Sequence, residues 1–194
     1  MPLIKENSCY TYANILEWDE NTRAELINGE IVLMSPPFRV HQQIAMELLL
    51  QIGKFLEGKP CKVYPSPFGV RLFPEKDLSD DTYVEPDITV VCDSSKLDDR
   101  GCNGAPDFII EILSPSTASH DRLVKFRKYQ QAGVREYWIV DPDNETVQAC
   151  RLDQQGYVVT MFSSTDSAPV AVLPKLEIDL SRVFQDLPNH SIKD

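Results

Sequence analysis

The sequence has no long apolar run. Although 42% of its 194 residues are hydrophobic, no window approaches about 18 uninterrupted apolar residues, so a membrane-spanning helix is not expected. The first twenty residues also carry polar and acidic side chains where a secretory signal peptide needs an apolar segment. We therefore expect a cytoplasmic protein that does not enter a membrane.

Paired cysteine motifs are also missing. The five cysteines stand at positions 9, 61, 92, 102 and 150, an odd number without any CxxC spacing. This pattern argues against a disulfide framework and against a zinc knuckle, and it suits a reducing compartment. Free, partly buried thiols are the prediction.

Positive charge is scarce. Lys and Arg number 19 against 30 Asp and Glu, which leaves a formal net charge of −11. This balance argues against broad nonspecific attraction to nucleic acid, because such binding comes largely from Lys and Arg on phosphates. No helix-turn-helix or zinc finger is recognisable either. The balance still permits a locally basic groove, or a group of carboxylates that a metal ion neutralises.

No internal repeat or low-complexity segment divides the chain, and its length suffices for one core. We therefore expect a single domain over residues 1–194. Asn28-Gly29 lies between two short alternating apolar segments, which predicts a hairpin because both turn residues tolerate positive φ. In residues 39–57, apolar side chains recur at helical spacing, which predicts the longest helix. These side chains are Ile44, Leu48, Ile52 and Phe55.

The remaining elements alternate between strands and short helices. We expect a short helix in 11–20, a strand, bend and strand in 61–74, a helix over 120–132, and a short helix near 179–181. Further strands are expected over 83–92, 107–113, 135–141, 145–152 and 156–162. The order predicts a mixed α/β (α+β) fold around one sheet.

Glu111 lies in the middle of the apolar strand 107–113. Alternate residues of a strand share a face, and an isolated buried carboxylate is costly, so Glu111 needs a partner. Asp87 follows Pro86 in the preceding predicted strand, and the two carboxylates meet if these strands are neighbours. Two acidic groups at one place repel each other, and a divalent cation that keeps several waters removes the repulsion, as is usual for Mg²⁺. The alternative is an ion pair of Glu111 with Lys125 or Arg127, with Asp87 capping a turn.

The predicted helix 120–132 supplies a cation. Asp121, Lys125 and Tyr129 stand at i, i+4 and i+8, so they share one stripe. Lys125 beside Glu111 is suited to orienting water or to stabilising charge on a phosphate. The alternative is an ordinary i,i+4 salt bridge between Lys125 and Asp121, and Tyr129 is predicted to be structural rather than catalytic.

Several motifs together resemble one family. They are "ELINGE" at 25–30, His41 opening the long helix, "PDITVV" at 86–91, "PDFIIEILSPST" at 106–117, the D…K…Y pattern at 121, 125 and 129, and "GVREYWIVDP" at 133–142. The set resembles the Uma-two family of restriction-endonuclease-related proteins, within the PD-(D/E)xK nucleases, and covers most of residues 11–160.

The resemblance implies a restriction-endonuclease-like core and a Mg²⁺- or Mn²⁺-dependent phosphodiesterase. Asp87 and Glu111 would be its metal ligands. The chain departs from the general motif at Leu113, where (D/E)xK requires lysine. The resemblance implies that Lys125, one helix later, takes the place of this lysine and completes the catalytic set Asp87, Glu111 and Lys125.

The resemblance also points to accessory residues. An acid from an early element can add a metal ligand or a water contact, and Glu30 is preferred to Glu25 for this role. His41, Asp121 and Tyr129 are the other accessory candidates.

Three functions are compatible with these residues. The first is a metal-dependent DNA endonuclease in which a metal-activated water attacks the phosphorus. A homodimer would supply it with a second cleavage site, since nucleases of this fold often pair. The second is a catalytically inactive nuclease-fold protein that acts as a binding or assembly module, which the net charge and Leu113 favour. The third is a hydrolase of another phosphodiester, such as RNA or a nucleotide. Metal-dependent stabilisation discriminates the first two.

Overall fold

The computed structural model describes residues 9–18, 23–114, 119 and 121–187. Its helices are α1 (Tyr12–Ile15), α2 (Arg39–Leu56), α4 (Phe126–Ala132) and α5 (Leu180–Val183), with a 3₁₀ turn at Ser94–Lys96 and a π turn at Asp121–Lys125. Its strands are β1 (Ala24–Ile27), β2 (Glu30–Leu33), β3 (Lys62–Pro65), β4 (Gly69–Arg71), β5 (Tyr83–Val84), β6 (Ile88–Val91), β7 (Leu97–Asp98), β8 (Gly101–Asn103), β9 (Phe108–Ile112), β10 (Glu136–Asp141), β11 (Thr146–Asp153), β12 (Gly156–Ser163), β13 (Ser167–Pro169) and β14 (Glu177–Asp179).

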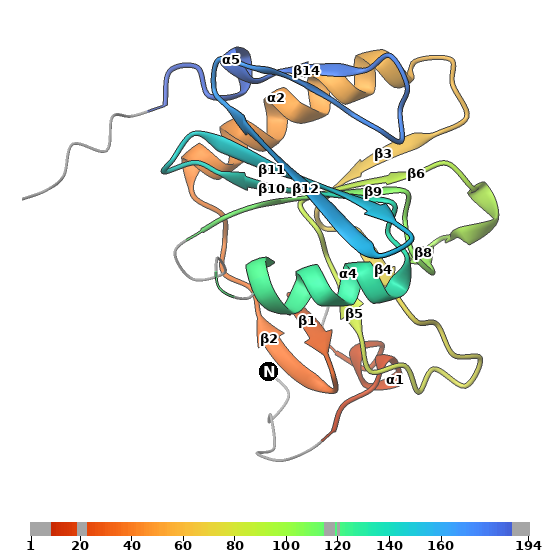
Figure 1. The fold of residues 1–194 in the computed structure, drawn as a ribbon. Coiled ribbons are helices and arrows are strands. Elements are labelled where there is room, and N and C mark those ends of the chain that lie inside the picture. Colours follow the sequence, from red (N-terminus) through yellow and green to blue (C-terminus); the bar gives the residue numbers. More distant parts are fainter. Residues whose placement is uncertain (1–8, 19–22, 115–118, 120, 188–194) are drawn as a thin grey trace, which may run out of the picture.

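Two six-stranded sheets form the frame of the mixed α/β fold. The central sheet has the order β12-β11-β10-β9-β6-β3, and the hairpin sheet has the order β2-β1-β5-β4-β8-β7. A small pair, β13 and β14, lies beside α2 and α5 (Figure 1). The single sheet expected from the sequence is therefore wrong, because the predicted hairpin pairs with β5 and not with the central strands.

A separate hydrophobic core covers each face of the central sheet. On one face, Ile44, Leu48 and Ile52 of α2 pack against alternate residues of β6 and β9. On the other face, Tyr129 of α4 and residues of the hairpin sheet pack against Ile109 and its neighbours. Figure 1 shows α2 and α4 on opposite sides of this sheet. Strand β9 is consequently buried along its whole length, which explains its nearly continuous apolar sequence.

The predicted hairpin and long helix are both present. Asn28 and Gly29 have φ values of 54° and 76°, as a tight two-residue hairpin turn requires. Helix α2 buries the expected stripe, except that Leu56 is buried where Phe55 was expected and Phe55 is only partly buried. The short terminal helix α5 begins after Asp179, whose side chain accepts a hydrogen bond from Ser181.

The strand predicted over 83–92 is in fact two strands. β5 belongs to the hairpin sheet and β6 to the central sheet, and the chain crosses between them at residues 85–87. Pro86 lacks a backbone N–H and cannot continue a ladder, which accounts for the interruption. The break places Asp87 at the entrance of β6, where the two sheets approach each other.

One predicted pair of free thiols is a disulfide. Cys61 precedes β3 and Cys92 follows β6, and the pairing of Lys62 with Val91 places the two cysteines opposite each other, where they are bonded. Cys9, Cys102 and Cys150 are free, as expected. The prediction failed at this pair because the cross-strand register is non-local and the spacing in sequence does not reveal it.

Within the described ranges, no helix combines the length and apolar character needed to cross a bilayer.

Candidate active site

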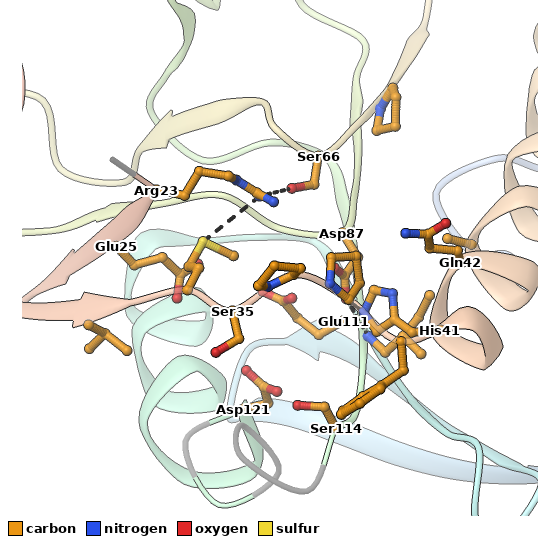
Figure 2. Close-up of a pocket in the computed structure, with 18 of the residues that line it drawn as sticks. Arg23, Glu25, Ser35, His41, Gln42, Ser66, Asp87, Glu111, Ser114 and Asp121 are labelled. Atoms are coloured by element: carbon orange, nitrogen blue, oxygen red, sulfur yellow. Dashed lines mark hydrogen bonds and ion pairs between the residues drawn. The ribbon is translucent and has the colours of Figure 1, made fainter. Parts of the chain in front are cut away.

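A cavity of about 710 Å³ opens between the hairpin sheet, the first turn of α2 and the edge where β6 and β9 meet. Acidic side chains from several elements converge in it: Figure 2 shows Glu25, Asp87, Glu111 and Asp121 around its interior. The cavity therefore brings together residues that are far apart in the sequence.

Glu111 is held by two donors from the helical segment after β9. Its Oε1 accepts a hydrogen bond of 2.9 Å from Lys125 Nζ and one of 2.6 Å from the Tyr129 hydroxyl. Glu111 and Lys125 are each only 4% exposed. The Glu111–Lys125 ion pair that the sequence left as the alternative to a metal ligand is thus present, and it is buried at the cavity.

Lys125 is surrounded by carboxylates. Besides Glu111, its Nζ donates to Glu25 Oε1 at 2.8 Å and lies 3.5 Å from Asp121 Oδ1. Lys125 ends the π turn, and Asp121 begins it. Such turns often occur at functional sites, and this one is followed directly by α4, which carries Tyr129 on the same stripe.

Asp87 stands next to Glu111 across neighbouring strands. β6 and β9 are antiparallel and pair Ile88 with Ile110, so continuation of the register places Asp87 opposite Glu111. Asp87 Oδ2 accepts a 2.7 Å bond from the Ile112 backbone N–H and lies 3.0 Å from His41 Nε2. Because a carboxylate accepts, Nε2 is the protonated ring nitrogen in this contact. Asp87 is therefore oriented by β9 and α2 rather than by a turn of its own.

The electrostatics of the cluster follow from burial. Burial raises the pKa of Glu111 well above its ordinary value; Lys125 opposes this effect, and the other carboxylates strengthen it. Burial alone would lower the pKa of Lys125, but the surrounding carboxylates raise it well above its ordinary value. Lys125 therefore remains an ammonium at neutral pH.

The donor set fits a hard divalent cation. In the part of the chain that the structure describes, no hydrogen bond reaches Asp87 Oδ1 or Glu111 Oε2. Two carboxylate oxygens with several retained waters are the usual protein contribution to a magnesium site. Among the described residues, no group of three or more acidic, histidine or cysteine side chains is arranged as a ligand set. The chain would accordingly supply two ligands, Asp87 and Glu111, and water the others.

The predicted site residues divide into two groups. Asp87, Glu111, Lys125, Asp121 and His41 line the cavity, and Tyr129 contacts Glu111 from behind. Glu30 does not line it: it is an exposed residue at the start of β2. The preference for Glu30 over Glu25 is therefore wrong: Glu25 is the hairpin acid at the cavity, where it is buried and paired with Lys125.

Among the cavity residues to which sequence analysis assigned no site role are Arg23 and Phe38, and Glu25 was ranked below Glu30. Glu25 and Glu30 both belong to the predicted hairpin. The register pairs Ile27 with Glu30, so both acids lie on one face of the hairpin, and the sequence does not show which of them reaches Lys125. Arg23 precedes β1 and binds Ser66 Oγ at 2.7 Å and Glu85 Oε2 at 3.1 Å. Phe38, at the start of α2, also lines the cavity. The available signal for Phe38 was an aromatic residue at a position where helices prefer a polar cap.

Residues 12–181 match the sequence model of the family described as "Uma2: Putative restriction endonuclease". The chain belongs to this family. The Uma2 match spans every residue of the acidic cluster, from Glu25 in β1 to Tyr129 in α4.

Relatives of this Uma2 chain include two proteins of Synechocystis, the uncharacterized proteins slr1290 and sll1609. The first is 24% identical over 155 residues, covering 78% of this chain and 79% of the relative. The second is 25% identical over 146 residues, covering 73% and 80%.

A solved structure shares the fold. It is the crystal structure of "a putative nuclease belonging to DUF820" from Anabaena variabilis, with a TM-score of 0.72 and 23% identity. The alignment covers 90% of this chain and 97% of that one. The restriction-endonuclease-like fold expected from the sequence is confirmed.

Proposed function

We propose that this Uma2 chain is a Mg²⁺- or Mn²⁺-dependent phosphodiesterase that acts as a DNA endonuclease. The observation that carries the proposal is the placement of the Lys125 ammonium on Glu111, beside Asp87, inside an open cavity. Family membership supports a nuclease-like activity independently of this geometry.

Each residue has a separate role in the proposal. Asp87 and Glu111 hold the cation through their open oxygens, and a cation bound there supplies charge neutralisation and a water of lowered pKa. Lys125 keeps a positive charge facing the scissile phosphate, where it stabilises negative charge that develops during hydrolysis. His41 fixes the orientation of Asp87, and Tyr129 that of Glu111, as outer-shell partners of metal ligands generally do.

The first test is thermal melting of chelator-treated protein with and without millimolar Mg²⁺ or Mn²⁺. Binding to the folded state adds RT ln(1 + [L]/Kd), about 2.7 kcal/mol when the metal is at 100 times Kd. We expect the melting temperature of the wild type to rise and that of Glu111→Gln to stay unchanged. Glu30→Gln is the matched control, because it removes an exposed carboxylate outside the cavity, and it should keep the rise.

The second test is cleavage of a supercoiled plasmid and of circular single-stranded DNA and RNA in the same metals. Asp87→Asn and Glu111→Gln should lower the rate at least about 100-fold, while Glu30→Gln should retain it. Equal cleavage by wild type and Glu111→Gln would refute these roles. If the wild type shows no melting shift and no cleavage, the alternative is favoured: a nuclease-fold protein that acts as a binding or assembly module.

A further inference from the structure

The cavity has an apolar wall in addition to its acidic interior. The segment that links β2 to α2 supplies this wall, with Leu33, Met34, Pro36, Pro37 and Phe38. Phe38 is 70% exposed and Leu33 is 47% exposed. Large apolar side chains thus face solvent beside a group of buried carboxylates.

Phe38 has no evident structural purpose at its position. It is the N-cap residue of α2, where Ser, Thr, Asp or Asn would satisfy a free backbone N–H, and it provides no such bond. Its ring is not buried in either core. The position therefore gives up a helix cap and exposes an aromatic ring, and the ring remains available to an external partner.

The first turn of α2 connects Phe38 to the proposed metal ligands. His41, three residues later, contacts Asp87 at 3.0 Å, and one helical turn advances only about 5.4 Å along the axis. An aromatic ring that lines the same cavity as a phosphodiester site is suited to stacking on a nucleobase, because every base offers a π face.

The size and charge of the cavity disfavour an intact duplex. Its volume of about 710 Å³ lies in the range of sites that enclose small ligands. Among the described residues that line it, two carry a fixed positive charge, Arg23 and Lys125, against four carboxylates. Duplex binding by phosphate contacts needs a larger number of cations. Glu111 is also too deeply buried to meet a phosphate on the outside of a rigid helix.

We propose that the site takes an unpaired nucleotide strand, with one base stacked on Phe38 and the adjoining phosphodiester at Asp87 and Glu111. This inference rests on the proposed function and names its substrate class: strand ends, flaps, loops or single strands rather than paired duplex. Stacking replaces most of the electrostatic attraction that a chain of charge −11 lacks.

The test is binding of fluorescein-labelled 12-mer DNA and RNA single strands and of the matching DNA duplex to the wild-type protein in Ca²⁺, which keeps both proposed metal ligands. We expect single strands to bind more tightly than the duplex. In the same background, Phe38→Ala should weaken single-strand binding by about 5- to 150-fold, and Phe38→Trp should restore it. The control is Met46→Ala, an exposed apolar residue of α2 that does not line the cavity, which should bind as its parent does.

Salt dependence gives an independent readout. If the two cations that line the cavity in the described part of the chain, Arg23 and Lys125, each contact one phosphate, the slope of log K against log salt should be no steeper than about −1.4 for a single strand. Equal or tighter duplex binding, or equal loss in Phe38→Ala and Met46→Ala, would overturn the inference, as would the absence of any binding. If the protein cleaves DNA but Phe38→Ala binds single strands as its parent does, the proposed function holds and the single-strand site is wrong. If binding depends on Phe38 but the protein cleaves nothing, the single-strand site holds and the proposed nuclease activity is wrong.

Discussion

Lys125 carries its charge where a lysine would ordinarily lose it. Its side chain is buried, yet Glu25, Glu111 and Asp121 all lie within 3.5 Å of its Nζ. Removing one partner of a buried ion pair is far more costly than removing a surface pair. The cluster is therefore expected to stabilise the fold as well as to form the proposed catalytic centre. The stability of each variant has to be measured together with its metal binding and activity.

A change at Tyr129 tests the structural and the metal-binding role of the cluster together. Tyr129→Phe removes the hydroxyl that donates to Glu111 but keeps the ring, which packs edge-on against Tyr137. We expect the free energy of unfolding to fall by about 1.5–3 kcal/mol, the range for a hydrogen bond to a charged group, and the metal-dependent melting shift to shrink. Urea denaturation and melting with and without Mn²⁺ measure the two quantities.

The control for this change is Tyr157→Phe. The Tyr157 hydroxyl donates to the neutral carbonyl of Val134 at 2.8 Å, so its loss should cost about 0.5–1.5 kcal/mol and leave the metal shift intact. A metal shift that is equally reduced in both variants would show that Tyr129 does not act through Glu111.

At the scale of elements, the hairpin β1–β2 and helix α2 place different parts of the site. The hairpin delivers Glu25, and the first turn of α2 delivers Phe38 and His41. Both elements follow from local sequence: Asn28-Gly29 predicts the turn, and the apolar stripe predicts the helix. Which acid of the hairpin faces Lys125 depends on how the two sheets pack, and that contact is not encoded locally. The Cys61–Cys92 bond and the separation of β5 from β6 also depend on contacts between distant parts of the chain, so the local sequence did not predict them.

Two glycines in these elements should respond to alanine with opposite signs. Gly29 has a positive φ, and an added Cβ would lie 2.4 Å from Cys9 Sγ, so Gly29→Ala should destabilise the protein by at least about 1 kcal/mol. Gly53 lies within α2 with nothing within 4 Å of an added Cβ, so Gly53→Ala should stabilise it by about 0.5–1 kcal/mol. Chemical denaturation measures both, and two changes of the same sign would contradict the positions assigned to these residues.

At the scale of the whole molecule, the five cysteines report on the fold. Burial raises the pKa of Cys102 and of Cys150 to about 11, so below that pH both remain unreactive thiols. With the 61–92 bond formed, a thiol reagent at pH 8 should modify only exposed Cys9 in the native protein and three cysteines in denaturant without reductant. Reaction of buried thiols should begin only as the pH approaches 11 or the chain unfolds. Five reactive thiols in unreduced, denatured protein would show that the bond is absent.

The sequence-level expectations for the whole molecule have unequal outcomes. The fold class and the family are confirmed, because many motifs spread over most of the chain carry them jointly. The single domain, the homodimer and the cytoplasmic location stay predictions. Lys125 was placed correctly on Glu111 because strand β9 and the helical segment after it adjoin in sequence, whereas Glu25 lies 100 residues from Lys125.

That separation of 100 residues has a consequence during synthesis. Ribosomes add about 5–20 residues per second, so Glu25 is made some 5 to 20 s before the lysine that neutralises it. Throughout this interval Glu25 lacks the ammonium that pairs with it in the fold, and burying a carboxylate without a countercharge is costly. We therefore expect the Glu25–Lys125 contact, and with it the complete site, to form only after residue 125 has been synthesised, when both sheets and α4 are available.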